Sequence, residues 1–181
     1  MRVPPRAGAQ VIIGVAIAIP APYSESLTRA RIDAGDPEAL AIAPHITLLP
    51  PTAVEPDDLD EIQRHLHVVA HGRRPFVVAI SGTDTFRPVS PVVFVAMTEG
   101  AEGCAELNSA VNDGPLAQPL RFPYHPHVTI AHDLDDTALD AAGAALAGFS
   151  ARFPVAQFAL YQYGDDGTWR EVETYALVSR D

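Results

Sequence analysis

Lysine is missing from this sequence of 181 residues: all 12 basic residues are arginine. Enzymes that join chains through a covalent nucleotidyl-lysine need that amine as nucleophile, so this chemistry is excluded. Cysteine is scarce as well, and the single Cys104 leaves no internal disulfide to form. Because Cys104 shares helical spacing with Leu107 and Val111, we expect a small buried core residue rather than a catalytic thiol.

Positive charge and long apolar runs are also in short supply. The formal net charge is -11, which argues against binding along a nucleic acid, where affinity comes from many arginine and lysine contacts with phosphate. The apolar run Val11–Ile19 is too short for a membrane-spanning helix. Its β-branched residues favour a buried first strand over a signal peptide. We therefore expect a cytoplasmic protein, without a membrane partner, that acts as a monomer.

The remaining composition is that of a compact globular protein. Hydrophobic residues make up 48% of the chain and charged residues 19%, and no linker or low-complexity tract divides it. Strands and helices are expected to alternate, with several strands joined directly. This order predicts an α+β fold with largely antiparallel sheets. The expected strands cover 11–19, 43–49, 76–80, 92–97, 126–131, 153–163 and 169–179, and the expected helices cover 22–34, 56–71, 101–112 and 136–147.

Each half of the chain carries one copy of the pattern Pro-His-apolar-Thr-apolar, at Pro44–Leu48 and at Pro126–Ile130. Side chains of a strand alternate between its two faces, so His45 and Thr47 share one face. The same alternation places His127 and Thr129 together. Two such strands facing each other would present two imidazoles and two hydroxyls to one cleft.

This pair of groups suits acid–base chemistry on a phosphate. One neutral imidazole can take a proton from water while a protonated imidazole gives one to the leaving oxygen, because the reference pKa of histidine is about 6.5. Threonine hydroxyls can hold the non-bridging oxygens without adding charge. Tyr124 and His125, which precede the second motif, are further candidates for binding the substrate.

The two motifs, His45-Ile46-Thr47 and His127-Val128-Thr129, resemble those of the two-histidine (2H) phosphoesterase superfamily. Its LigT-like branch contains RNA 2′,3′-cyclic phosphodiesterases and 2′-5′ RNA ligases. The resemblance covers nearly the whole chain and implies one domain, 1–181, of two pseudo-symmetric lobes around a central cleft. Each lobe would be a mostly antiparallel sheet with flanking helices.

The resemblance also implies an activity. The expected substrate is a small nucleotide or an RNA terminus with a 2′,3′-cyclic phosphate, opened to a 2′-phosphate without a metal or other cofactor. His45 would be the acid and His127 the base, with Thr47, Thr129, Tyr124 and His125 binding substrate. Ligation of 2′-5′ RNA would be the reverse of a related reaction.

Two alternatives stay open. The scaffold could bind a phosphorylated ligand without turnover, although binding alone does not require two proton-transfer groups. A metal-dependent hydrolase could use His125, His127 and His132, since imidazoles are common metal ligands. The three histidines His65, His67 and His71 fall off the apolar stripe of their predicted helix, and we expect them on the surface.

Overall fold

The computed structural model describes residues 3–119 and 122–179. Its helices are α1 (Tyr23–Asp33), α2 (Leu59–Ala70), α3 (Ala101–Val111) and α4 (Asp136–Ala145), with short 3-10 turns at Pro56–Asp58 and Gly114–Leu116. Its strands are β1 (Val11–Ala18), β2 (His45–Val54), β3 (Phe76–Thr85), β4 (Val92–Glu99), β5 (His127–His132), β6 (Ser150–Val155), β7 (Gln157–Tyr163) and β8 (Trp169–Ala176).

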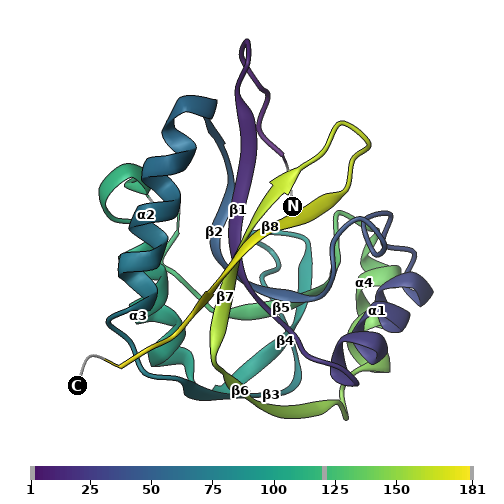
Figure 1. The fold of residues 1–181 in the computed structure, drawn as a ribbon. Helices are drawn as coiled ribbons and strands as arrows, with labels where there is room; N and C mark the ends of the chain where they lie inside the picture. The colour runs from purple at the N-terminus through teal and green to yellow at the C-terminus, as the bar shows by residue number, and fades with distance from the viewer. Residues whose placement is uncertain (1–2, 120–121, 180–181) are drawn as a thin grey trace.

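The strands form two antiparallel sheets of four strands each (Figure 1). Sheet A has the order β2-β1-β7-β8 and sheet B the order β5-β4-β3-β6. The two orders correspond, because a motif strand lies at one edge of each sheet and pairs with the strand that precedes it in the chain. The predicted α+β fold with two lobes and antiparallel sheets is confirmed.

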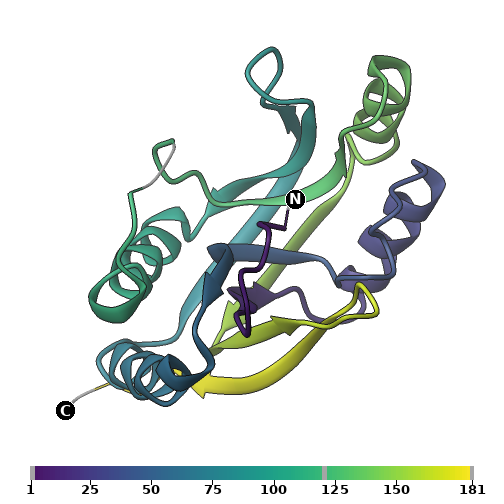
Figure 2. The ribbon, with the colours of Figure 1, turned by 90° about the horizontal axis from the view of Figure 1, so that it is seen from above.

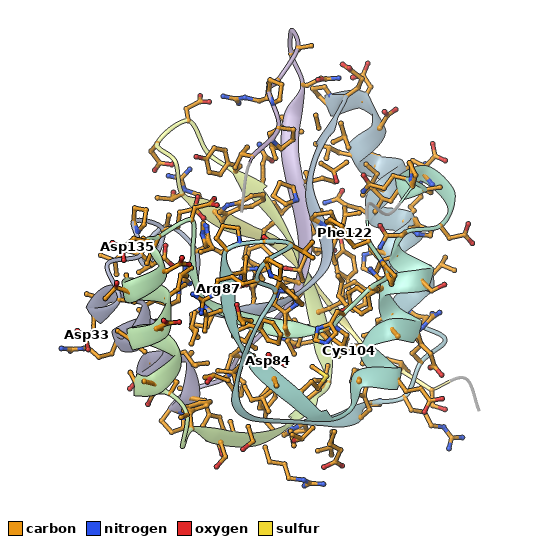
Figure 3. The ribbon with its side chains drawn as sticks, turned by 180° about the vertical axis from the view of Figure 1, so that it is seen from behind. Asp33, Asp84, Arg87, Cys104, Phe122 and Asp135 are labelled. Atoms are coloured by element: carbon orange, nitrogen blue, oxygen red, sulfur yellow. The ribbon has the colours of Figure 1, made fainter. Side chains whose placement is uncertain are left out.

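Two of the helices pack against the lobe opposite to the one whose strands they connect. Helix α1 joins two strands of sheet A, yet it contacts β5 and α4 beside sheet B. Helix α3 joins two strands of sheet B, yet it contacts β2 of sheet A and helix α2. Two helix pairs therefore flank the sheets, α1 with α4 and α2 with α3, as the two views show (Figures 1 and 2). Seen from behind, Asp33 of α1 and Asp135 before α4 lie on the same side of the molecule (Figure 3).

A continuous hydrophobic core joins the two sheets to their helices. The apolar run that begins at Val11 forms strand β1, as predicted, and its Ile12 and Ile13 are buried. Helix α2 buries Ile62, Leu66 and Val69 on one stripe, as its spacing predicts. Within the described residues, no helix is long and apolar enough to cross a membrane.

Three of the predicted strands have wrong boundaries, and one of them, expected at 76–80, continues as β3 to Thr85. The strand expected at 153–163 is two strands, because the chain leaves sheet B after Val155 and enters sheet A at Gln157. The sequence predicts that the first motif strand stops at Pro50, but β2 continues to Val54. Proline lacks an amide proton, and an edge strand such as β2 tolerates it where that amide would face away from the sheet.

Gly100, the residue before α3, gives the fold a point of strain for any larger side chain. Its φ is +87°, and a Cβ atom there would overlap the carbonyl oxygen of Val77 in β3. We expect Gly100→Ala to lower the free energy of unfolding by about 2 kcal/mol or more, from the left-handed backbone and the steric clash. Urea denaturation measures this. Gly72→Ala is the control, since a Cβ atom on Gly72 would meet no other side chain or distant backbone within 4 Å. Equal losses of unfolding free energy in both variants would contradict this account of Gly100.

Candidate active site

The two motif strands meet edge to edge between the lobes. Strand β2 lies at the edge of sheet A and β5 at the edge of sheet B, and the two strands contact each other. His45 is the first residue of β2, and His127 is the first residue of β5. The two imidazoles therefore lie at equivalent positions, each at the start of an edge strand of its sheet.

Alternation along the motif strands separates core from site. Ile46 and Leu48 are completely buried, and so is Val128 in the second motif. The histidines and threonines of both motifs are half-buried. Neither Thr47 nor Thr129 uses its hydroxyl in a hydrogen bond to the described part of the chain, which keeps both groups available to a ligand.

The residue before the proline of each motif provides a carbonyl that fixes the histidine ring. His45 Nδ1 lies 2.8 Å from the carbonyl oxygen of Ala43, and His127 Nδ1 lies 2.7 Å from that of His125. A carbonyl oxygen only accepts, so Nδ1 carries the proton and donates in both rings. A residue before proline prefers extended backbone, which helps to direct these carbonyls. In both neutral rings Nε2 is the nitrogen with a free electron pair.

Burial lowers the pKa of both imidazoles and so favours their neutral forms. Desolvation lowers the pKa of His45 to about 4, against an opposing effect of the hydrogen bond to Ala43, and the nearby charges of Arg31 and His127 lower it further. Desolvation also lowers the pKa of His127, against an opposing effect of the hydrogen bond to the His125 carbonyl, and the charge of His125 lowers it further. Because the charge of His127 lowers the pKa of His45, protonation of one imidazole opposes protonation of the other.

Aromatic side chains surround His127. Phe86, which follows β3, meets its ring edge-on at 4.9 Å between ring centres, and Phe94 of β4 lies at 5.1 Å. His125 is exposed and packs against Phe86 at 5.3 Å. Neither phenylalanine is among the site residues that the sequence predicts. Phe94 of β4 pairs with Thr129 of β5. A correct prediction of this strand pairing would therefore have placed Phe94 next to the second motif.

The segment that carries Phe86 is held in place by its next residue. Arg87 makes ion pairs of 3.1 Å with Asp136 and 2.5 Å with Asp140 of helix α4. Figure 3 shows Arg87 beside that helix. This arginine therefore fixes the loop over His127 rather than facing the histidine pair.

A small cavity lies beside His45. Residues from all four strands of sheet A line it, among them Gly14, Thr47, Tyr161 and Trp169. A Cβ atom on Gly14 would lie 3.3 Å from the Trp169 ring, so the absence of a side chain lets the indole approach β1 closely. The aromatic side chains of Tyr161 and Trp169 thus line the same cavity as His45.

Tyr124 is tied to the first motif. Its hydroxyl donates to the carbonyl oxygen of Thr47 at 3.0 Å, across the boundary between the lobes. Burial raises the pKa of this phenol. Its ring packs against the core, so only part of the side chain remains for a ligand. Its role in substrate binding stays a prediction.

The residues of the metal alternative do not form a ligand cluster. His132 Nε2 lies 3.2 Å from Glu38 Oε2 and 3.9 Å from Asp36 Oδ1. Across residues 3–119 and 122–179, no group of three His, Cys, Asp or Glu side chains is placed to hold a metal ion.

The structure decides two other sequence predictions. Cys104 is buried in the core, where desolvation raises its pKa to about 12, so the predicted structural role is confirmed. His67 and His71 are exposed as expected. The surface prediction is wrong for His65, which is half-buried with Nε2 3.1 Å from the carbonyl oxygen of Ala110 in α3.

Two antiparallel sheets, each with a His-x-Thr strand at its edge, define a LigT-like fold, and comparisons with known proteins agree. The model of the 2′-5′ RNA ligase superfamily matches residues 19–167. The chain therefore belongs to that superfamily. A protein of Bacillus mycoides (strain KBAB4), named as a candidate phosphoesterase, is 30% identical over 144 residues, which cover 78% of this chain and 83% of the relative.

Solved structures share the whole fold. The crystal structure of E. coli LigT complexed with 3′-AMP has a TM-score of 0.73 at 21% identity and covers 93% of this chain and 98% of LigT. The complex of E. coli LigT with NADP+ gives 0.71 at 23% identity, over 94% and 99% of the two chains. The protein TT0787 of Thermus thermophilus gives 0.61 at 19% identity, over 94% and 100%. The family and its relatives support a phosphoesterase activity.

The lowered pKa of His45 couples stability to pH. A neutral buried imidazole favours folding fully above the unfolded pKa of about 6.5, and this contribution is lost as the pH falls toward the folded pKa of about 4. We expect His45→Asn to lose less unfolding free energy than the wild type between pH 7 and pH 5. Urea denaturation at both pH values tests this. His71→Asn, at an exposed site, should lose as much unfolding free energy as the wild type over this pH range. An equal loss in His45→Asn would contradict the burial of a neutral His45 ring.

Proposed function

We propose that the protein is a metal-independent phosphodiesterase that opens 2′,3′-cyclic phosphates of nucleotides or RNA ends. The observation that carries this proposal is the paired Nδ1–carbonyl hydrogen bond, made by His45 and by His127 at equivalent positions of two facing strands. It leaves two Nε2 atoms for proton transfer, with Thr47 and Thr129 on the same strands.

In the proposed reaction, water attacks phosphorus and the bond to the sugar 3′ oxygen breaks. His127 Nε2 takes the proton of the water, and His45, protonated at Nε2, gives a proton to the departing oxygen. The product is a 2′-phosphate. The hydroxyls of Thr47 and Thr129 donate to the non-bridging oxygens and hold phosphorus in line.

The ligand class follows from the same features. Nucleotides occupy the E. coli LigT structures named above, which supports a nucleotide or a chain terminus as substrate. The net charge of -11 disfavours long nucleic acid. Aromatic side chains on both sides of the histidine pair, Trp169 and Phe86 among them, can contact a base or sugar.

Substitution of the four motif residues tests the mechanism. Each of His45→Ala and His127→Ala should reduce kcat/KM by roughly 10²–10⁴-fold, and the double variant should lose little more because the pair acts as a unit. Thr47→Val and Thr129→Val should each cost about 1–3 kcal/mol of transition-state stabilisation, from a lost hydrogen bond to an anion. The assay uses 2′,3′-cyclic nucleotides and short cyclic-phosphate-ended RNA in EDTA.

His71→Ala is the control for these variants and should retain wild-type turnover. Near wild-type activity of His45→Ala on every cyclic phosphate would overturn the two-histidine mechanism. Loss of wild-type turnover in chelator would favour a metal-dependent hydrolase. Ligand-induced thermal stabilisation without any product would identify a binding module instead.

The pH dependence gives an independent test. One imidazole must be protonated and the other neutral, so kcat/KM should be bell-shaped, with its maximum below pH 6.5 because burial lowers both pKa values in the free protein. A bound phosphate anion favours the imidazolium ion and raises these pKa values. The profile of kcat should therefore lie at higher pH than that of kcat/KM. A maximum of kcat/KM above pH 7 would contradict the buried, neutral pair.

A further inference from the structure

We propose that Arg31 is a positioning residue for His45: it holds the loop between α1 and β2 and thereby aims the carbonyl that orients the imidazole. The proposal rests on the proposed function only in taking His45 as one of the two catalytic groups. Arg31 lies in the last turn of α1, away from the motif itself, and nothing in the His-x-Thr pattern points to it.

All three nitrogens of the Arg31 guanidinium donate a hydrogen bond to this loop. The residue is only 4% exposed. Its Nε donates to Asp36 Oδ2 at 2.8 Å, its Nη1 to the carbonyl oxygen of Ile42 at 2.6 Å and its Nη2 to that of Glu38 at 3.0 Å. These contacts fix both ends of the segment 36–42, since Asp36 begins it and Ile42 closes it.

The held segment runs directly into the site. Ile42, whose carbonyl Arg31 binds, is followed by Ala43, whose carbonyl accepts the Nδ1 proton of His45 at 2.8 Å. The next carbonyl, that of Pro44, accepts from the amide of Ile19 at 3.2 Å. A shift of the Ile42 peptide would turn the Ala43 carbonyl away from the ring. The two carbonyls belong to consecutive peptide groups, so Arg31 acts on His45 through the single residue Ala43.

The same loop is tied to the second motif strand. His132, the last residue of β5, places Nε2 3.2 Å from Glu38 and 3.9 Å from Asp36. Strand β5 begins with His127, and helix α1 contacts this strand as well. The Arg31–Asp36 pair is thus placed to set the loop of His45 relative to the strand that carries His127.

The chemistry of the pair favours positioning over stability. Two buried charges cost desolvation energy that their attraction often does no more than offset, so such a pair is weak evidence for a stabilising role. A guanidinium has a rigid fork of donors and can bind a carboxylate and two carbonyls together, which an ammonium group on a flexible stem does less well. Arginine at this position suits a site that must hold three acceptors at once.

The test measures the tautomer of His45, which a merely structural role of Arg31 does not change. In the wild type, 15N spectra of histidine at pH 7.5 should show neutral His45 with its proton on Nδ1. In Arg31→Lys, and in the double variant Arg31→Met with Asp36→Leu, which removes both buried charges, the Nε2-protonated form should become populated. On cyclic phosphates, kcat should fall roughly 10–100-fold with KM changed less, as for a misplaced catalytic group.

Arg73→Met is the matched control, because Arg73 also donates to a backbone carbonyl, that of Val69 in α2 at 2.7 Å. It should leave the His45 tautomer and kcat unchanged. The proposal is overturned if both Arg31 variants fold, lose stability in urea and keep the wild-type tautomer. The tautomer is read without substrate, so a changed tautomer supports the role of Arg31 even if wild-type protein shows no turnover, which would count against the proposed function alone.

Discussion

The site depends on one geometric constraint: β2 and β5 are edge strands of different sheets, and they contact each other. Each strand buries its apolar residues, Ile46 and Leu48 in one and Val128 in the other. Alternation then leaves the histidine and threonine of each motif on the opposite face. A shift of one residue in either register would bury the imidazole and expose the core residues.

Two helices that pack against the opposite lobe stabilise the contact between β2 and β5. Helix α1 packs on β5 and α3 packs on β2, so each motif strand is covered by a helix that begins in the other lobe. The lobes cannot separate without breaking this packing. Tyr124 adds a hydrogen bond across the same boundary, from its hydroxyl to the carbonyl of Thr47. A rigid distance between the two imidazoles is what an in-line displacement at phosphorus requires.

The two halves of the site share a motif but differ in their surroundings. His127 lies among Phe86, Phe94 and His125, whereas His45 adjoins a cavity with Tyr161 and lies within the field of Arg31. Desolvation lowers the pKa of both rings, and the positive charge of Arg31 adds to this only at His45. Two chemically similar histidines can thus receive different proton affinities from the structure around them.

The sequence by itself determined the strand-and-helix order, the two His-x-Thr strands and the buried state of Cys104, because alternation and helical spacing are local properties of the chain. It did not reveal that residues 153–163 divide at Ala156 between two sheets, since a run of apolar residues carries no information on its pairing partner. Only the tertiary structure brought Arg31 to the loop of His45 and Phe86 to His127. These contacts join residues distant in the chain, and packing of the two lobes decides them.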